Sequence, residues 1–417
     1  MEIRREELEV MAPAGNFESL AAAIQGGADS VYFGIGNLNM RSHSANNFGE
    51  EDLETIVKTC AQAGVKSYLT LNIVLYDEDI EDMRSAVDRA KVAGVSAIIA
   101  SDMAAITYAR SIGMEVHIST QLNISNIESV KYHAQFADVV VLARELRLDQ
   151  VKNICDAIIR EEIKGPSGEL IKIEMFCHGA LCMAVSGKCY LSLHEYSASA
   201  NRGACYQLCR RGYEVTDLET GLSLEVDNKY IMSPKDLSTI AFVDKMVAAG
   251  VRVFKIEGRA RAPEYVKTVV QTYRSAADAV CNGEYTPEFI ADLQKRLSSV
   301  FNRGFWDGYY QGAKLGEWSD VYGNKATKKK EYVGKVTNFF SNLSVAEVLI
   351  ETGELNVGDD IIIIGPTTGV IEHRVDEIRV ELNSVDKSVK GEYCSISLPA
   401  GTKLRRSDKV YLWRGNN

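Results

Sequence analysis

Short hydrophobic runs rich in β-branched residues recur along most of the chain, and most of them follow a stretch that ends in glycine. Such a glycine adopts the left-handed conformation that closes a helix, and an apolar run after it is typical of a strand buried on both faces of a parallel sheet. Eight units of this kind in about 260 residues predict a (β/α)8 barrel, with an open doubly wound sheet as the alternative. The strands are expected within residues 8–15, 26–34, 62–72, 92–102, 112–121, 136–145, 170–179 and 248–259.

The pattern changes after the lysine-rich stretch ATKKKEY at 326–332, where apolar and polar residues alternate with period two. Turn signals at 356–360 and 399–402 separate the alternating segments, which is typical of short antiparallel strands. We therefore expect a barrel domain over residues 1–325 and a small β-barrel over 326–417. The segments VGKV and SDKVYL in the second domain resemble domain two of translation elongation factors.

Composition describes a globular protein: 46% of its 417 residues are hydrophobic, 25% are charged and the formal net charge is −10. Such a charge argues against holding nucleic acid by bulk electrostatics, but it leaves room for a local basic face. The basic residues around the second domain offer one, or else form a solvated linker; they are Lys325, Lys328, Lys329, Lys330, Lys403, Arg405 and Arg406. The charged start of the chain lacks a secretory pattern, and no apolar run is long enough to span a membrane, so we expect a cytoplasmic protein.

Four of the nine cysteines, Cys182, Cys189, Cys205 and Cys209, follow the spacing C-x6-C-x15-C-x3-C, and we call residues 177–210 the cysteine segment. Clustered thiols in a reducing compartment favour a metal site. Structural zinc usually takes closer cysteine pairs than Cys182 and Cys189 form, whereas iron-sulfur clusters accept looser spacings. An iron-sulfur cluster is therefore the first interpretation, with zinc and then free structural thiols as alternatives.

Polar residues end several of the predicted strands, and in a barrel of this kind the chemistry lies at the carboxyl ends of the strands. Arg259 and Arg144 are suited to bind a carboxylate through paired hydrogen bonds. Glu257 would orient Arg259 or accept a proton, and His178 comes four residues before Cys182. The candidate residues at these strand ends are Asn72, Gln121, Arg144, His178, Glu257 and Arg259. The alternative interpretation is that some of these residues only cap loops or face solvent.

Ordered motifs carry a family resemblance: EMFCHGALCMAVSGKCYLS at 174–192, ANRGACYQLCR at 200–210 and KIEGR at 255–259. From residue 8 to 315 the chain resembles the collagenase-like peptidases, the unassigned peptidase family thirty-two. It looks most like the members that hydroxylate the wobble uridine of tRNA at C5 with prephenate as cosubstrate and without molecular oxygen. The resemblance implies a 4Fe-4S cluster on the four cysteines, prephenate near Arg259, Gln121 and Asn72, and a tRNA anticodon loop as partner.

The family name also implies proteolysis, although the chain has no HExxH or G-x-S-x-G motif. Cys182 with His178 is the one pair that suits a thiol peptidase, and thiolates committed to a metal are poor nucleophiles. A third alternative is an RNA-binding module with a structural cluster. For the hydroxylase, Tyr190, Tyr196 and Phe48 are candidates to stack on the extruded base.

Overall fold

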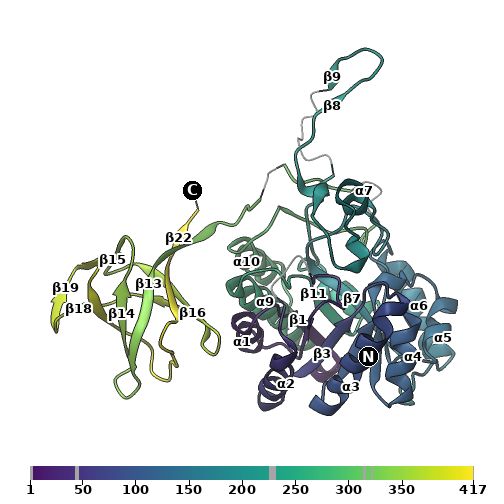
Figure 1. Ribbon diagram of the computed structural model, residues 1–417, viewed down its shortest axis with the longest axis horizontal. Helices are drawn as coiled ribbons and strands as arrows, with labels where there is room; N and C mark the ends of the chain where they lie inside the picture. Colours follow the sequence, from purple (N-terminus) through teal and green to yellow (C-terminus); the bar gives the residue numbers. More distant parts are fainter. Residues whose placement is uncertain (1–2, 43–46, 225–231, 313–315, 321–322, 417) are drawn as a thin grey trace.

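The computed structural model describes residues 3–42, 47–224, 232–312, 316–320 and 323–416. Figure 1 shows two units side by side, a barrel of strands and helices and, on its left, a unit of strands only.

The first unit is a closed barrel of parallel strands. Strand β11 hydrogen-bonds both to β1 and to β7, so the sheet closes on itself and the open-sheet alternative is excluded. The barrel predicted from the hydrophobic runs is thereby confirmed. The barrel strands are β1 (Glu9–Pro13), β2 (Ser30–Phe33), β3 (Lys66–Leu71), β4 (Ala97–Ala100), β5 (Glu115–Ile118), β6 (Val139–Val141), β7 (Lys172–Gly179) and β11 (Val253–Ile256).

Helices surround the barrel and begin and end at residues that cap them. Asn16 accepts a hydrogen bond from the amide of Ser19 at the start of α1, and Gly94 ends α3 with a φ of 83°. The helices are α1 (Phe17–Gln25), α2 (Leu53–Gln62), α3 (Ile80–Ala93), α4 (Met103–Ser111), α5 (Ile127–His133), α6 (Leu148–Arg160), α8 (Val243–Ala248), α9 (Pro263–Asn282) and α10 (Pro287–Ser298).

The connection from β7 to β11 is much longer than the others and carries the cysteine segment. It contains helix α7 (Leu191–Tyr196) and a hairpin of β8 (Val215–Thr216) and β9 (Ser223–Leu224), which projects from the barrel in Figure 1. It also contains β10 (Asp236–Ser238), which runs antiparallel to the end of β7 and pairs with β12 (Phe305–Trp306). The sequence pattern did not predict these two short strands, because their pairing is set by distant segments.

The second unit is an antiparallel sheet around a core of its own, as the alternating pattern predicted. Its strands pair in the order β17, β16, β22, β13, β14, β21, β18 and β19, with β15 and β20 paired separately. Their bounds are β13 (Lys328–Phe340), β14 (Val345–Ile350), β15 (Glu354–Asn356), β16 (Asp360–Gly365), β17 (Gly369–Arg374), β18 (Ile378–Val380), β19 (Asn383–Val385), β20 (Lys387–Val389), β21 (Tyr393–Ser397) and β22 (Lys409–Gly415).

The lysines expected in a hinge are part of this sheet instead. Lys328 and Lys330 lie at the start of β13, where they pair with β22, and Lys330 forms an ion pair with Glu264 of the barrel. A solvated linker is therefore the wrong description of residues 328–330. Alternation alone did not reveal the strand because three consecutive lysines mask it.

The two units are docked by specific contacts. Gln25 at the end of α1 donates to the carbonyl of Thr368 at 2.6 Å and accepts from the amide of Val370 at 2.9 Å. Side chains of the β unit also join the hydrophobic core of the barrel, namely Ile362, Ile364, Val370 and Trp413. The relative position of the units is therefore held by both packing and hydrogen bonds.

Among the described residues, none of the helices combines the length and the apolar character needed to cross a lipid bilayer.

Candidate active site

A cavity of about 630 Å³ lies at the carboxyl ends of the barrel strands. The cysteine segment forms one side of it and the strand ends form the other. All of the residues predicted from the strand ends and cysteine spacing line it, with the exception of His178; they are Asn72, Gln121, Arg144, Glu257, Arg259, Cys182, Cys189, Cys205 and Cys209. The volume suits a small organic ligand together with part of a larger one.

Arg259 is held rigidly just beyond β11. Its Nη1 donates to Asn39 Oδ1 and to Thr70 Oγ1, both at 2.9 Å, and only 6% of the residue is exposed. The glycine at position 34 leaves room for the guanidinium of Arg259, because a Cβ on residue 34 would lie 2.7 Å from Nη1. Burial lowers the pKa of Arg259 to about 10, which keeps the guanidinium charged at neutral pH. The rest of the guanidinium has no other hydrogen-bond partner among the described residues, so it is available to a ligand.

Glu257 pairs with Arg41, not with Arg259. Arg41 Nη2 donates to Glu257 Oε1 at 2.9 Å, and Tyr265 donates to the main-chain oxygen of Glu257 at 3.0 Å. Burial opposes ionisation of Glu257, but the nearby guanidinium of Arg41, followed by that of Arg259, outweighs it and lowers the pKa. Glu257 is therefore a carboxylate that orients Arg41, which disfavours the proton-accepting role considered from the sequence.

Arg144 faces the first cysteine of the cluster. Its Nη2 donates to Ser186 Oγ at 3.0 Å, and its guanidinium lies 5.1 Å from the ring centre of Phe176. Burial disfavours the charge of Arg144, and the nearby sulfur of Cys182 more than offsets this, so the pKa of Arg144 is raised. Arg144 thus supplies a second cation to the cavity.

A buried lysine provides a further cation at the cavity. Lys255 precedes Glu257 by two residues on β11, and its Nζ lies 2.6 Å from Glu174 Oε1 on β7. Nζ also lies 4.7 Å from the ring centre of Tyr32, which lines the same cavity. The sequence gives no sign of this role for Lys255, because a lysine inside an apolar run does not reveal that Glu174 lies opposite it.

His178 lies outside the cavity, although it comes only four residues before Cys182, the first of the four clustered cysteines. Its ring is packed between the aromatic rings of Tyr265, Tyr273 and Phe305, at 5.5 to 5.9 Å between ring centres. Burial lowers the pKa of His178 to about 3, so the ring is neutral at physiological pH. This position gives no support to a catalytic role for His178 or to a pair of His178 with Cys182.

A β-bulge explains why His178 turns away from the cavity. Opposite β7, Lys255 pairs with Phe176 and Ile256 pairs with His178, so that Cys177 is an extra residue on β7. An extra residue shifts the alternation of side chains by one and moves the next side chain to the other face. Cys177 itself is fully buried in the barrel wall.

The two amide candidates line the cavity near its floor. Asn72 accepts from the amide of Met40 at 3.3 Å and donates to Ser119 Oγ at 3.4 Å. Gln121 Oε1 is buried without a hydrogen-bond partner, and a buried acceptor in that state is free to bind a donor of a ligand.

All four clustered cysteines line the cavity, and the thiol of Cys182 is the one most affected by its charges. Cys182 is exposed and lines the cavity. Burial inside the protein raises its pKa, and the guanidinium groups of Arg144 and Arg41 overcome this and lower it. The thiolate form, which is the metal-binding form, is therefore favoured at this position.

The donor set fits a sulfur-liganded metal group. Four thiols line one cavity, as a cluster with four cysteine ligands requires, and cations compensate thiolate charge at Cys182, whereas burial raises the pKa of Cys209. In the described part of the chain, no group of three or more His, Cys, Asp or Glu side chains is arranged so that it could hold a metal ion. The four cysteines therefore line one cavity without converging on a single point.

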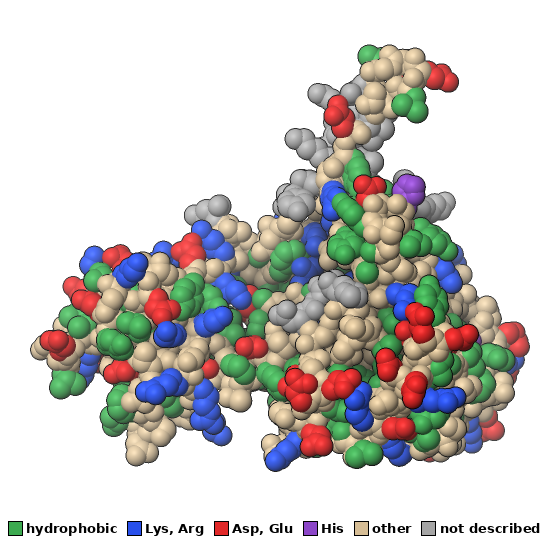
Figure 2. Space-filling view, viewed as in Figure 1, with side chains coloured by type: hydrophobic (Ala, Val, Ile, Leu, Met, Phe, Trp, Pro, Cys, Tyr) green, Lys and Arg blue, Asp and Glu red, His purple; other side chains and the backbone are tan. Residues whose placement is uncertain are grey.

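Of the tyrosines considered for stacking on a base, Tyr190 lines the cavity and is 69% exposed. Tyr196 does not line the cavity; it is exposed and packs edge-on against Tyr206 at 5.3 Å between ring centres. Figure 2 shows hydrophobic side chains gathered over this region around α7. Phe48, in contrast, is 4% exposed and packs against Phe17 and Phe33, so its predicted stacking role is wrong.

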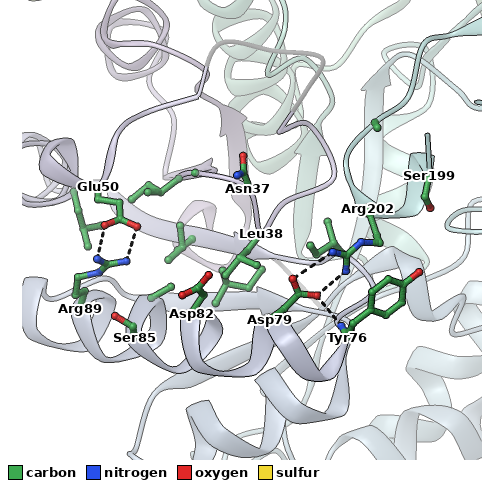
Figure 3. A pocket seen from close by; sticks show the side chains of 18 of the residues that line it. Asn37, Leu38, Glu50, Tyr76, Asp79, Asp82, Ser85, Arg89, Ser199 and Arg202 are labelled. Atoms are coloured by element: carbon green, nitrogen blue, oxygen red, sulfur yellow. Dashed lines mark hydrogen bonds and ion pairs between the residues drawn. The ribbon is translucent and has the colours of Figure 1, made fainter. Parts of the chain in front are cut away.

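A second cavity, of about 810 Å³, lies outside the barrel between α3 and the cysteine segment. Figure 3 shows two ion pairs in its wall, one between Glu50 and Arg89 and one between Asp79 and Arg202. The guanidinium of Arg202 also lies 4.0 Å from the ring centre of Tyr76. Because Arg202 lies between Cys189 and Cys205, this wall anchors the cysteine segment to the barrel.

Comparison with known proteins assigns the chain to a family. The model of peptidase family U32 matches residues 15–320, which include every barrel strand except β1 and the whole cysteine segment. The chain belongs to peptidase family U32. This confirms the resemblance found in the sequence motifs.

Relatives in this family carry two kinds of name. A protein named collagenase from Porphyromonas gingivalis is 62% identical over 97% of this chain and 97% of its own length. A tRNA hydroxylation protein P1 from Bacillus subtilis is 33% identical over 89% of this chain and 86% of its length. A 23S rRNA 5-hydroxycytidine synthase from Escherichia coli is 33% identical over 76% of this chain and 47% of its length.

Arg41, Lys255 and Tyr32 line the cavity, and reasoning from strand ends alone missed them. Arg41 lies in a loop well beyond β2, and Tyr32 lies inside an apolar run. The FGIGNLNMR motif at 33–41 contains Arg41 and was the one signal in the sequence for it.

Proposed function

We propose that this protein hydroxylates the wobble uridine of tRNA at C5, with prephenate as cosubstrate and an iron-sulfur cluster on Cys182, Cys189, Cys205 and Cys209. The observation that carries the proposal is that these four cysteines and Arg41, Arg144 and Arg259 line one cavity. The relatives named for tRNA hydroxylation and for 5-hydroxycytidine synthesis in rRNA support an RNA base as the substrate.

Prephenate carries two carboxylates. The cations that line the cavity outnumber those needed to neutralise Glu257, so positive charge is left for a ligand. Arg259 uses only Nη1 within the protein, and Arg144 makes one short hydrogen bond, to Ser186. Both are therefore suited to bind a carboxylate through charge-assisted hydrogen bonds. Lys255 also lines the cavity, but Glu174 already neutralises its charge, so Arg259 and Arg144 are the cations left for prephenate.

The cluster would be held by the four cysteines, and when bound it would supply either electron transfer or polarisation of a hydroxyl group of the oxygen donor. The chain's own residues have separate tasks. Arg144 and Arg41 compensate the charge of the thiolates, as they already do for Cys182. Glu257 holds Arg41 in place at 2.9 Å, so that the charge beside Cys182 is fixed before any ligand arrives.

The uridine must leave its stack to reach the cavity, and a wobble base does so at small cost because it is single-stranded. Tyr190 at the entrance is exposed enough to stack on the extruded base. Replacing C5–H by C5–OH adds one oxygen atom and oxidises the base by two electrons, so the reaction also requires an oxygen donor and a two-electron acceptor. The cationic wall of the cavity supports the binding of prephenate.

The direct test combines anaerobic purification with an in vitro assay. We expect bound iron, sulfide and visible absorbance, and formation of 5-hydroxyuridine in unmodified tRNA only when prephenate is present, measured by nucleoside mass spectrometry. Arg259→Ala should abolish modification while tRNA binding persists, and Arg379→Ala on the far side of the β unit serves as the matched control. Protein without iron, or unchanged nucleosides with loaded protein, would refute the proposal. Persistent tRNA binding with no modification by the wild type would favour an RNA-binding module.

Peptidase activity is the second candidate, because the 62% identical relative is named collagenase and the thiolate of Cys182 is favoured. The two functions differ in what they require of the other cysteines. A thiol peptidase needs Cys182 alone, whereas a cluster needs all four. Gelatin cleavage that survives Cys209→Ala but is lost in Cys182→Ala would establish the peptidase. Loss of hydroxylation in both variants supports the cluster.

A further inference from the structure

A groove of about 720 Å³ separates the barrel from the β unit. On the barrel side it is lined by Asn16 and Pro263, which stand at the starts of α1 and α9. On the other side it is lined by residues 405–409, a loop that leads into β22. The described function of the cavity in the barrel makes no use of this groove.

The groove is a fixed feature because the units beside it are docked. Lys330 at its edge forms an ion pair with Glu264 at 2.9 Å. Lys267 donates to the carbonyl of Val370 at 2.9 Å, and Gln25 holds the same loop from α1. Its two walls therefore keep their spacing without a ligand.

Three exposed cations are concentrated on the loop wall. Arg405, Arg406 and Lys409 line the groove, and none of them forms an ion pair with a carboxylate in the described part of the chain. Arg406 donates through Nε to the carbonyl of Thr337 at 2.7 Å, which fixes its side chain without neutralising it. The chain as a whole carries a net charge of −10, whereas these three cations make the loop wall of the groove locally positive.

The carboxylates of the groove do not cancel these cations. Asp408 is 1% exposed and accepts from Thr368 Oγ1 at 2.5 Å and from the amide of Arg405 at 2.7 Å. Its charge therefore serves to fold the loop. Glu18 is partly exposed at the opposite wall, and Lys330 is already neutralised by Glu264. The surface offered to a ligand is thus positive.

The chain connects this groove directly to the candidate active site. Glu257 and Arg259 line the cavity, and Pro263, four residues later, lines the groove. Asn16 likewise comes three residues after β1. Both positions lie at the end of the barrel where the strands have their carboxyl ends, so the groove and the cavity open at the same end of the barrel.

We propose that the groove binds the sugar-phosphate backbone of the RNA whose base enters the cavity. This inference rests on the proposed function and adds to it the surface that holds the body of the RNA. Arg405, Arg406 and Lys409 would each contact a phosphate, which is the type of contact that positions a nucleic acid without selecting its sequence. Figure 2 shows Lys and Arg side chains at the edge of the β unit that faces the barrel.

The test measures binding of an unmodified tRNA transcript to the full chain at several salt concentrations. The triple variant Arg405→Ala, Arg406→Ala, Lys409→Ala should bind about ten- to a hundredfold more weakly at low salt. The slope of log affinity against log salt should fall by about one unit for each lost contact. The control variant Arg379→Ala, Lys387→Ala, Lys390→Ala removes the same charge from the far end of the β unit and should leave both quantities unchanged.

Two further variants keep the result interpretable. Arg405→Lys with Arg406→Lys keeps the charge and should retain most of the binding, and Glu18→Gln should tighten binding by removing the opposing carboxylate. Equal weakening in the groove and control triple variants, or no weakening in either, would overturn the inference. The inference would also be overturned if the groove variant lost binding to an acidic polypeptide while its binding to RNA stayed unchanged.

Failure of the proposed function looks different. If the wild-type chain binds no tRNA at all, the RNA substrate itself is refuted. If it binds and modifies tRNA and the groove variant does so equally well, only the groove is refuted.

Discussion

Lys255 and Glu174 form an ion pair inside the barrel, with 2.6 Å between Nζ and Oε1 and side-chain exposures of 7% and 0%. The second carboxylate oxygen of Glu174 is buried without a hydrogen-bond partner. Strands β11 and β7 adjoin where the barrel closes, so this pair spans the closing seam. A charge pair in such a position is costly to break from one side.

Removing one partner of this pair should be more damaging than removing both. Lys255→Met leaves a buried carboxylate without its cation, and we expect it to lower the free energy of unfolding by about 3 to 5 kcal/mol. Lys255→Met combined with Glu174→Leu should recover a large part of that loss. Denaturant unfolding followed by far-ultraviolet circular dichroism measures both, and equal losses in the single and double variants would contradict the role of the pair.

Neutral His178 predicts a pH dependence of stability on the acid side. Its pKa is about 3 in the folded protein against 6.5 for the free side chain, because burial disfavours the charged ring. The unfolded state therefore binds a proton as pH falls below 6.5, and the folded state does not until about pH 3. The stability contribution is complete above pH 6.5 and falls by up to about 1.4 kcal/mol per pH unit below it.

His178→Phe should remove that slope, since phenylalanine does not titrate in either state. Unfolding free energies at pH 7, 6 and 5 in wild type and variant measure the difference. The exposed residue His194, changed to Phe, provides the control. Parallel curves for wild type and His178→Phe would show that the ring is not held neutral.

Asp79 anchors the cysteine segment through Arg202, with hydrogen bonds of 2.6 and 3.3 Å. Asp79→Ala should cost about 1.5 to 3 kcal/mol locally, as loss of a charged hydrogen bond does, and should loosen residues 189–205. Limited proteolysis and hydrogen exchange of this stretch should both become faster. Glu50→Ala removes the ion pair with Arg89 in the same cavity wall without touching the segment, and it should leave those rates unchanged.

Gln25 holds the β unit against α1 through Thr368 and Val370. Gln25→Ala should weaken docking by about 1 kcal/mol per lost hydrogen bond and should accelerate hydrogen exchange at the amide of Val370 by about fivefold or more. Exchange measured by mass spectrometry on a peptide that spans 366–374 gives the rate. Gln62→Ala, on the exposed face of α2, is the control, and equal rates in the two variants would mean that packing alone docks the unit.

Local sequence determined the architecture of this protein. An apolar run, in most cases after a glycine that ends a helix, is a short-range signal, and the repetition of such runs predicted the barrel strands. The alternating pattern likewise predicted the antiparallel unit, and the barrel topology then placed Arg259 and the cysteine segment at one end. These inferences succeeded because they depend on spacing along the chain.

Tertiary structure decided which side chains meet. A single extra residue at Cys177 turned His178 out of the cavity, and no local pattern reveals a bulge that exists only in the pairing of β7 with β11. Arg41 reaches Glu257 from a loop 216 positions away in the sequence. Phe48 is buried because it packs against the ring of Phe33 at the end of β2, a contact that forms only in the folded chain. Spacing along a chain dictates elements and their order, whereas contacts between remote segments depend on register and loop paths that emerge only when the whole chain has folded.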